Sequence, residues 1–209
     1  MKQEQRGQRV NGSVSEATEE KVAPFRTYLF FALVGSSILF LSMVLMFIIW
    51  YTHHATNNQF QLPKTFIVST LTLLFSSYSL SLVHHYFKQD DARKLLIALS
   101  CTLLLGGLFT VMQIVSWRSL YQQGWVPGDD ASIAFLYIIT GLHFMHVGGG
   151  LIYLFYLTLK AFDIWNDPVR SLLYFSNHYE AARLSLFSIY WHFIDGLWLF
   201  LFLTFLFTL

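Results

Sequence analysis

Four titratable side chains occur in two stretches of the sequence that are otherwise apolar. His143 and His146 lie within TGLHFMHVGGG, and His192 and Asp195 lie within SIYWHFIDGLWLF. Each pair has a three-residue spacing, which places both members on one face of a helix. Imidazole and carboxylate groups in such a setting can fasten helices by hydrogen bonds, ligate a haem or a metal, or carry protons.

The composition of the whole chain is that of a membrane protein. Of the 209 residues, 55% are hydrophobic and only 12% are charged, whereas soluble domains average about 25% charged residues. A helix of about 20 apolar residues crosses the hydrocarbon core. Five stretches have this length: 27–51, 65–87, 95–117, 133–159 and 184–209.

These stretches predict an all-α fold. We expect one polytopic membrane bundle of five transmembrane helices at residues 27–209, following a tail at residues 1–26. The tail is polar and of mixed charge, which predicts disorder. Pro24 is expected to prevent a continuous helix through it.

Basic residues are distributed unevenly over the polar connections. Of the 13 Lys and Arg residues, eleven fall in the tail and in the second and fourth connections, and two fall in the first and third. Cytoplasmic connections are enriched in Lys and Arg. The pattern predicts a cytoplasmic N-terminus and a C-terminus on the outside. A net charge of +1 gives no reason to expect a nucleic-acid partner.

The depth of the titratable residues predicts which of them meet. At 1.5 Å per residue, His143 and Asp195 each lie roughly 15 Å into their antiparallel helices, near the bilayer centre. His146 and His192 share a level nearer the cytoplasm. We therefore predict an interhelical polar seam that joins His143 to Asp195 and places His146 near His192. We expect this seam to fasten the helices, while ligation and proton conduction stay open as alternatives.

Small residues suggest where helices approach closely. The runs at 106–107 and 148–150 consist of glycine, and small residues let membrane helices pack tightly. The single cysteine, Cys101, excludes an intramolecular disulfide. The sequence shows no metal-binding cysteine pattern, and we expect no metal site.

The two titratable stretches resemble the subunit III family of haem–copper oxidases, that is, cytochrome c oxidase subunit III in its five-helix bacterial form. YWHFIDGLWLFLF resembles the family's terminal helix, and TGLHFMHVGGG resembles the helix before it. LFTVMQIVSW and LVGSSILFLS resemble two earlier helices. The positions that match family motifs are His143, His146, His192, Asp195, Gln113, Trp191, Phe193, Trp198, Gly141 and Gly150.

The resemblance implies a non-catalytic, non-redox subunit of an oxidoreductase and proton-pumping complex in aerobic respiration. Such a subunit packs directly against catalytic subunit I, beside subunit II and other oxidase subunits, and could join a larger respiratory assembly. It holds phospholipids and supports stability and sustained proton uptake. It binds no haem or copper itself, because these cofactors reside in partner subunits. The implied location is the bacterial cytoplasmic membrane.

The sequence departs from the family at three positions. The family commonly has acids where Ser36, Ser116 and Ser185 stand. This departure argues against a carboxylate-based, proton-buffering role. It leaves the packing and lipid-holding roles unaffected.

Other functions compete with this interpretation. The electron donor binds other subunits, and we expect cytochrome c, with quinol as the alternative. An accessory subunit of a nitric oxide reductase would share these motifs. From other classes, a free-standing transporter or a haem-binding cytochrome b-like protein remains. The last two spans contain no proline, which disfavours a transporter built on broken helices.

Overall fold

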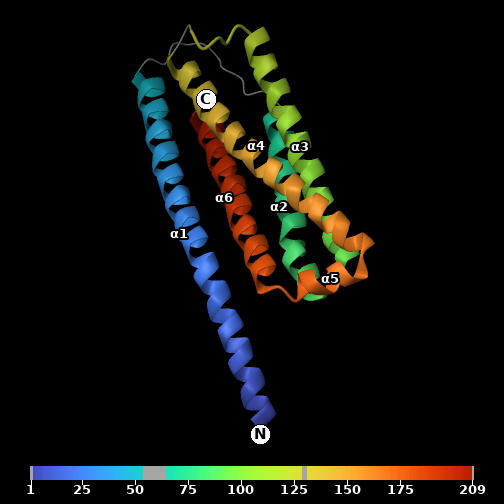
Figure 1. Cartoon of the computed structure of the whole chain (residues 1–209). Coiled ribbons are helices and arrows are strands. Elements are labelled where there is room, and N and C mark those ends of the chain that lie inside the picture. Colours follow the sequence, from blue (N-terminus) through green and yellow to red (C-terminus); the bar gives the residue numbers. More distant parts are fainter. Residues whose placement is uncertain (1, 54–64, 129–130, 209) are drawn as a thin grey trace.

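The computed structural model describes the backbone of residues 2–53, 65–128 and 131–208, with side chains from residue 22 onward within these ranges. The described residues form helices and no strand. The helices are α1 (Lys2–His53), α2 (Thr65–Lys88), α3 (Ala92–Gln122), α4 (Ala131–Asn166), α5 (Pro168–Phe175) and α6 (His178–Thr208). All except α5 are long and apolar enough to span a membrane. The predicted all-α bundle with five spans is confirmed (Figure 1).

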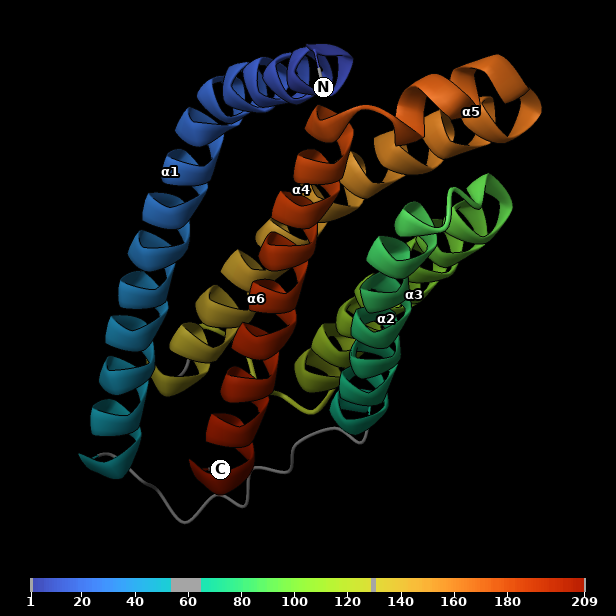
Figure 2. The same cartoon turned by 90° about the horizontal axis from the view of Figure 1, so that it is seen from below.

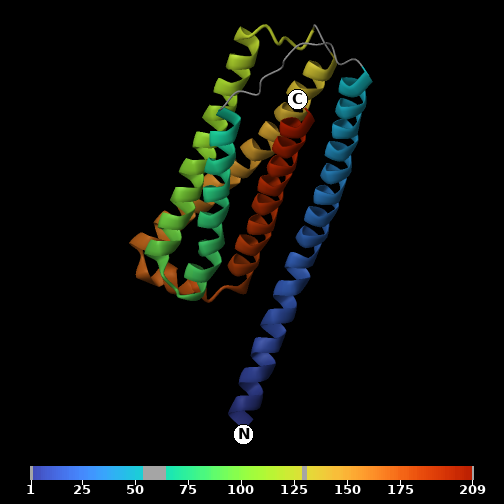
Figure 3. The same cartoon turned by 180° about the vertical axis from the view of Figure 1, so that it is seen from behind.

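The first helix differs from the prediction. It begins at Lys2, so the chain is helical through the segment that we expected to be a disordered tail. This part of α1 extends well beyond the other helices (Figures 1 and 3). Pro24 lies inside the helix. A proline removes one backbone donor, and Pro24 is exposed, at a place where water or headgroups can satisfy the freed carbonyl.

A tight turn joins α2 to α3. Asp90 has a φ of 54°, a left-handed conformation that aspartate tolerates better than most residues. Asp91 then caps α3, because its side chain accepts a hydrogen bond from the backbone N–H of Lys94 at 3.0 Å. This hydrogen bond lowers the pKa of the Asp91 carboxyl below its ordinary value. The turn fixes α2 and α3 as an antiparallel pair.

The interface between α2 and α3 is rich in hydroxyl groups. Ser79 donates to the carbonyl of Ala98 at 3.1 Å, and Ser76 donates to the carbonyl of Thr102 at 3.4 Å. Both serines are buried. Small hydroxyl residues let membrane helices approach closely and bond across their interface, which explains why this helix pair has the most extensive contact in the bundle.

The remaining long helices surround this pair. α6 packs against α2 and α1, and α4 packs against α3 and α1. Side chains of α4 and α6 also meet along the bundle, from the ring contact of His143 with Trp198 to the ion pair of Lys160 with Glu180. Figure 2 shows α5 at one end of the bundle, beside the α2–α3 turn. We call this end the α5 end.

Two clusters form the core. The cluster at the α5 end is mainly aliphatic, with Leu95 and Leu154 at its centre. The other cluster mixes aliphatic side chains with a larger share of aromatic rings, including Phe109, Trp198 and Phe205, and we call it the aromatic cluster. Trp198 stacks on Phe66 with ring centroids 5.9 Å apart, and it meets Phe109 edge-on at 5.1 Å.

Trp191 enters the core where two helices carry glycine. A Cβ atom at Gly150 would lie 3.0 Å from the Trp191 ring, and one at Gly106 would lie 3.1 Å from it. Gly107, Gly148 and Gly149 have nothing within 4 Å of such an atom. The glycine runs predict close helix packing. In the structure, only Gly106 and Gly150 of these runs make room for a neighbouring side chain.

Candidate functional site

The titratable pair on α6 faces α2. Nδ1 of His192 lies 2.7 Å from the hydroxyl oxygen of Ser77, and the same hydroxyl lies near the Asp195 carboxyl. Asp195 is 6% exposed, and its Oδ2 atom has no partner among the described residues. A single serine of α2 thus serves both polar residues of α6.

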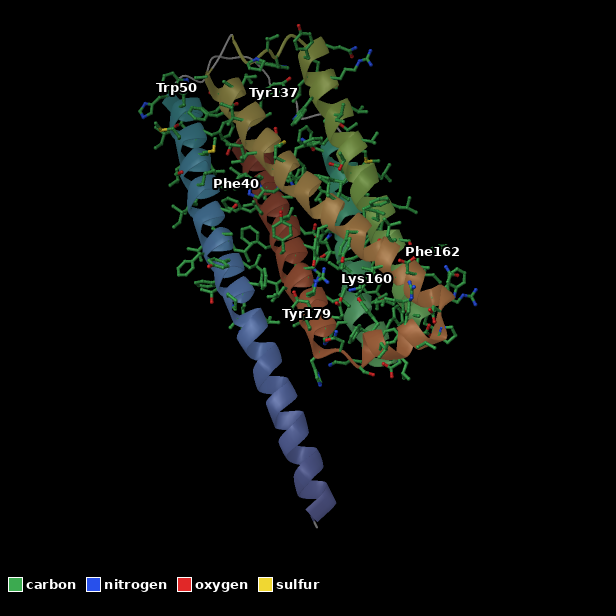
Figure 4. The ribbon with its side chains drawn as sticks, viewed as in Figure 1. Phe40, Trp50, Tyr137, Lys160, Phe162 and Tyr179 are labelled. Carbon is green, nitrogen blue, oxygen red and sulfur yellow. The ribbon has the colours of Figure 1, made fainter. Side chains whose placement is uncertain are left out.

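The pair on α4 is divided between two environments. Nδ1 of His146 lies 2.8 Å from the carbonyl oxygen of Leu142, so this nitrogen carries the proton and donates it. Nε2 then accepts from the hydroxyl of Ser36 on α1, at 3.4 Å. Phe40, which points from α1 into the bundle (Figure 4), contacts the same imidazole edge-on.

His143 occupies an aromatic setting. Its ring lies 4.9 Å from Trp198 and 5.9 Å from Phe109, measured between centroids. The side chain is fully buried, and neither ring nitrogen has a hydrogen-bond partner among the described residues. His143 therefore contributes to the packing of the aromatic cluster.

The predicted pairing of the four residues is not the one that the structure shows. His143 makes no hydrogen bond to Asp195, and His146 pairs with Ser36 rather than lying with His192. The physical reason is rotation about the helix axes. Equal depth allows two residues to meet only if their helices turn the same faces toward each other, and here His146 faces α1 and His192 faces α2. His143 does meet α6, but its ring packs on Trp198, three residues beyond Asp195.

The other motif positions are mainly packing residues. Gln113 is fully buried on α3, and neither atom of its amide group has a partner among the described residues. The indole N–H of Trp198 donates to Thr70 of α2 at 3.1 Å. Phe193 packs at the edge of the aromatic cluster. A Cβ atom at Gly141 would lie 4.0 Å from the Trp117 ring, which is an ordinary van der Waals contact.

The three serines at positions of family acids have different environments. Ser116 lies 2.7 Å from the Thr65 hydroxyl and joins α3 to α2. Ser36 joins α1 to α4 through His146. Ser185 is exposed on α6. Two of the three serines therefore make neutral contacts between helices.

A cluster of charges lies at the α5 end. Glu180 is 7% exposed and forms ion pairs with Lys160 at 2.7 Å and with Arg183 at 3.3 Å. Arg183 also donates to the hydroxyl of Tyr153 at 3.1 Å. Lys160 lies 5.3 Å above the ring of Tyr174, and burial raises the pKa of the Tyr174 hydroxyl above its ordinary value.

The predicted last span begins at residue 184 and leaves Glu180 in the connection before it, which is wrong. α6 already begins at His178, because the side chain of Asn177 accepts from the backbone N–H of Tyr179 at 3.0 Å. An Asn followed three residues later by Glu is a capping pattern. This pattern could have predicted both the start of α6 and the position of Glu180 in its first turn.

A cleft of about 750 Å³ lies between α1, α4 and α6 beside this charge cluster. Its lining residues are Val22, Phe25, Leu29, Gly149, Gly150, Tyr153, Tyr179, Arg183, Leu186, Phe187 and Tyr190. Figure 4 shows Tyr179 at this end of α6. Arg183 and the tyrosines supply polar groups, and the remaining side chains are apolar. Within the described part of the chain, no group of three or more His, Cys, Asp or Glu side chains could hold a metal ion.

Comparison with known proteins identifies the family of this chain. The sequence model described as "Cytochrome c oxidase subunit III" matches residues 25–208, which include all five spans. The chain belongs to this family. The predicted resemblance is thereby confirmed.

Similar curated proteins agree with the assignment. One from Staphylococcus aureus strain USA300, named "Probable quinol oxidase subunit 3", is 30% identical over 73% of this chain and 70% of its own length. A protein of the same name from Staphylococcus haemolyticus is 28% identical over the same shares. The chain is therefore a multi-pass membrane protein and a subunit III of a terminal oxidase complex.

Proposed function

We propose that this subunit III is a non-redox accessory subunit of a proton-pumping haem–copper oxidase in a bacterial cytoplasmic membrane. It packs against catalytic subunit I, which holds haem and copper, and it stabilises that subunit during turnover. The observation that carries the proposal is the environment of the histidines. They are engaged within the bundle, by aromatic packing at His143 and by serine hydroxyls at His146 and His192.

This environment supports a chain without bound haem. A bis-histidine haem site needs two imidazoles that face each other across an open space. Here Trp198 and Phe109 occupy the space beside His143. His146 and His192 face different helices. The expected haem and copper therefore belong to partner subunits, as the family assignment implies.

The cleft between α1, α4 and α6 suits a phospholipid. Its apolar walls match acyl chains, and Arg183 at the cleft can attract a phosphate group. Arg183 is only 20% exposed and shares Glu180 with Lys160. Two cations beside one carboxylate leave a net positive charge, which favours an anionic headgroup. Lipid in this cleft would connect the otherwise sparsely covered α1 to the bundle.

Quinol is the electron donor that we propose for the complex. Sequence reasoning favoured cytochrome c without a feature of this chain to support it. The similar Staphylococcus proteins carry the words "quinol oxidase" in their names. The donor site lies outside subunit III, on a partner subunit of the complex.

Purification of the tagged chain in mild detergent tests the subunit assignment. We expect subunit I to co-purify, with a haem spectrum, oxygen consumption driven by quinol and stoichiometric copper. A preparation that consumes nitric oxide, but not oxygen, would favour the nitric oxide reductase alternative. Stoichiometric haem bound to the isolated chain would contradict the non-redox assignment.

A pair of variants tests the lipid site. Gly149 lines the cleft and Gly148 does not, and both have open space at the Cβ position. Gly149→Leu should fill the cleft and reduce the phospholipid retained by the complex, as counted by native mass spectrometry. Gly148→Leu is the matched control and should retain the lipid. Equal lipid counts in the two variants would exclude this cleft as the site.

A further inference from the structure

The short helix α5 has two apolar faces. On one face, the rings of Tyr174 and Phe175 contact Phe87 at the end of α2, with centroids 5.7 Å and 5.3 Å apart. Asp167 starts the helix by accepting from the backbone N–H of Val169 at 2.9 Å, and Pro168 follows at the first helical position. The helix is thus firmly attached to the bundle through one side and one end.

The other side of α5 is open. Val169, Leu172 and Leu173 are 69%, 72% and 68% exposed. Their spacing places them on one stripe of the helix, which we call the open face of α5. Three aliphatic side chains on an eight-residue helix need a non-aqueous neighbour, because apolar surface in contact with water is unfavourable.

The last turns of α4, directly before α5, also carry exposed apolar side chains. Phe162 and Trp165, in the last turns of α4, are 49% and 48% exposed, and their rings contact each other. Figure 4 shows Phe162 pointing away from the bundle. Tryptophan is typical of the boundary between acyl chains and headgroups. Exposed apolar side chains therefore occur on both sides of the short connection between α4 and α5.

The place of α5 sets its depth. The 36 residues of α4 make a helix of about 54 Å, which exceeds a hydrocarbon core of about 30 Å. The helix is therefore longer than the core requires, which leaves room for its last turns, and α5 directly after them, at the headgroup level. Arg170 flanks the open face, is exposed, and pairs with Asp167. An apolar stripe flanked by a cation is the pattern of a helix that lies along a membrane surface.

We propose that α5 is an interfacial anchor, with its open face immersed in the acyl–headgroup boundary of the bilayer. The occupant of this face is lipid, because the membrane-spanning helix α4, which ends directly before α5, also exposes apolar rings in its last turns. The anchor holds the α5 end at a fixed depth and braces the α2–α3 turn through Phe87. This inference does not depend on the proposed function.

Spin-label accessibility in the assembled oxidase tests the proposal. Cys101, the single native cysteine, is replaced by Ser, and one cysteine is introduced as Leu173→Cys or Val169→Cys. The labelled complex is reconstituted into vesicles of phosphatidylethanolamine and phosphatidylglycerol. Collisions with oxygen and with a water-soluble nickel chelate are then measured. Both sites are exposed, so neither substitution removes core packing.

The three environments give three different results. A label in lipid collides several-fold more with oxygen than with the nickel chelate, which is the expected result at both sites. Gln89→Cys, at an exposed position of the neighbouring turn, is the control and should show the reverse preference. A nickel preference at positions 169 and 173 would mean that the face is in water. Low collision rates with both reagents would mean that a protein covers it. Either result would overturn the proposal.

Discussion

At the α5 end of α6, Glu180 lies between two cations, whereas near the middle of the same helix Asp195 lies near a serine hydroxyl. The two carboxyl groups are about equally buried, at 7% and 6% exposure. They differ in their distance from the membrane boundary. Near the boundary, long Lys and Arg side chains can reach both a buried acid and the headgroups. In the middle, charged partners would have to be buried as well.

The difference teaches how this fold distributes its polar contacts. The middle of the bundle uses neutral donors and acceptors, such as Ser77, Thr70 and Ser36, to join helices. The α5 end uses charges. Interhelical hydrogen bonds in membranes average about 0.6 kcal/mol, while breaking a buried ion pair costs about 3–5 kcal/mol. We therefore expect the α5 end to be the more sensitive of the two regions to substitution.

The largest effect is expected for Glu180. Glu180→Gln leaves Lys160 and Arg183 without their shared acid. Because both cations are partly exposed, at 29% and 20%, we expect a loss of about 2–4 kcal/mol, somewhat below that of a fully buried pair. Thermal unfolding of the purified complex, followed by loss of subunit III, measures the change.

The matched control for Glu180 is an exposed ion pair at the same end. Arg170→Gln breaks the pair with Asp167, in which the side chains are 66% and 43% exposed. Exposed pairs contribute about 0–1 kcal/mol, so this variant should stay close to the parent. Equal destabilisation by the two substitutions would contradict the view that burial gives the charge cluster its importance.

A second prediction concerns apolar packing in the middle of the bundle. In Gly150→Ala, the new methyl group would meet the rigid Trp191 ring at 3.0 Å, and overpacking of this kind costs about 1–3 kcal/mol. Gly148→Ala, where the space is open, should be neutral or slightly stabilising, because alanine favours the helix. Unfolding midpoints in detergent compare the two. A tolerated Gly150→Ala would show that Trp191 can move.

A third prediction tests the neutral contacts directly. A double-mutant cycle of Ser77→Ala and His192→Phe should give a coupling energy of about 0.6 kcal/mol, the average for hydrogen bonds in membranes. The same cycle for Ser36 and His146 should give less, because their contact is 3.4 Å rather than 2.7 Å. If the coupling energy between Ser77 and His192 were as large as the destabilisation expected for Glu180→Gln, the middle of the bundle and the α5 end would not differ in sensitivity.

Much of the fold was accessible from the sequence because membrane spans are set by length and hydropathy. The five spans and the all-α class follow directly from these properties. Two helix starts were missed although local signals existed. Asp167 followed by Pro168 predicts the beginning of α5, and Asn177 with Glu180 predicts that of α6.

The partners of the titratable residues were not accessible in the same way. Spacing and depth placed each pair on one face and at one level, but helix rotation decides which neighbour that face meets. Ser77 illustrates the difficulty. It is one of many hydroxyl residues on α2, and nothing in its local sequence distinguishes it from Ser81, which bonds to its own helix. Only the packing of α2 on α6 selects Ser77 for His192.

The smallest effect is expected at an exposed charge, Asp91, which extends the comparison to the surface of the α5 end. The backbone and side chain of Lys94 lower its pKa in the folded chain. A depressed folded pKa stabilises the fold above the unfolded pKa, and this contribution is lost as pH falls through the folded value. Asp91→Asn should therefore reduce the fall in the unfolding midpoint that occurs at acidic pH.

Lys94→Gln is the control for this prediction. It keeps the backbone donor, which is the main cause of the lowered pKa, so most of the pH dependence of the unfolding midpoint should remain. If Lys94→Gln removed it as completely as Asp91→Asn, the ion pair would be the source of the effect, and the helix cap would not.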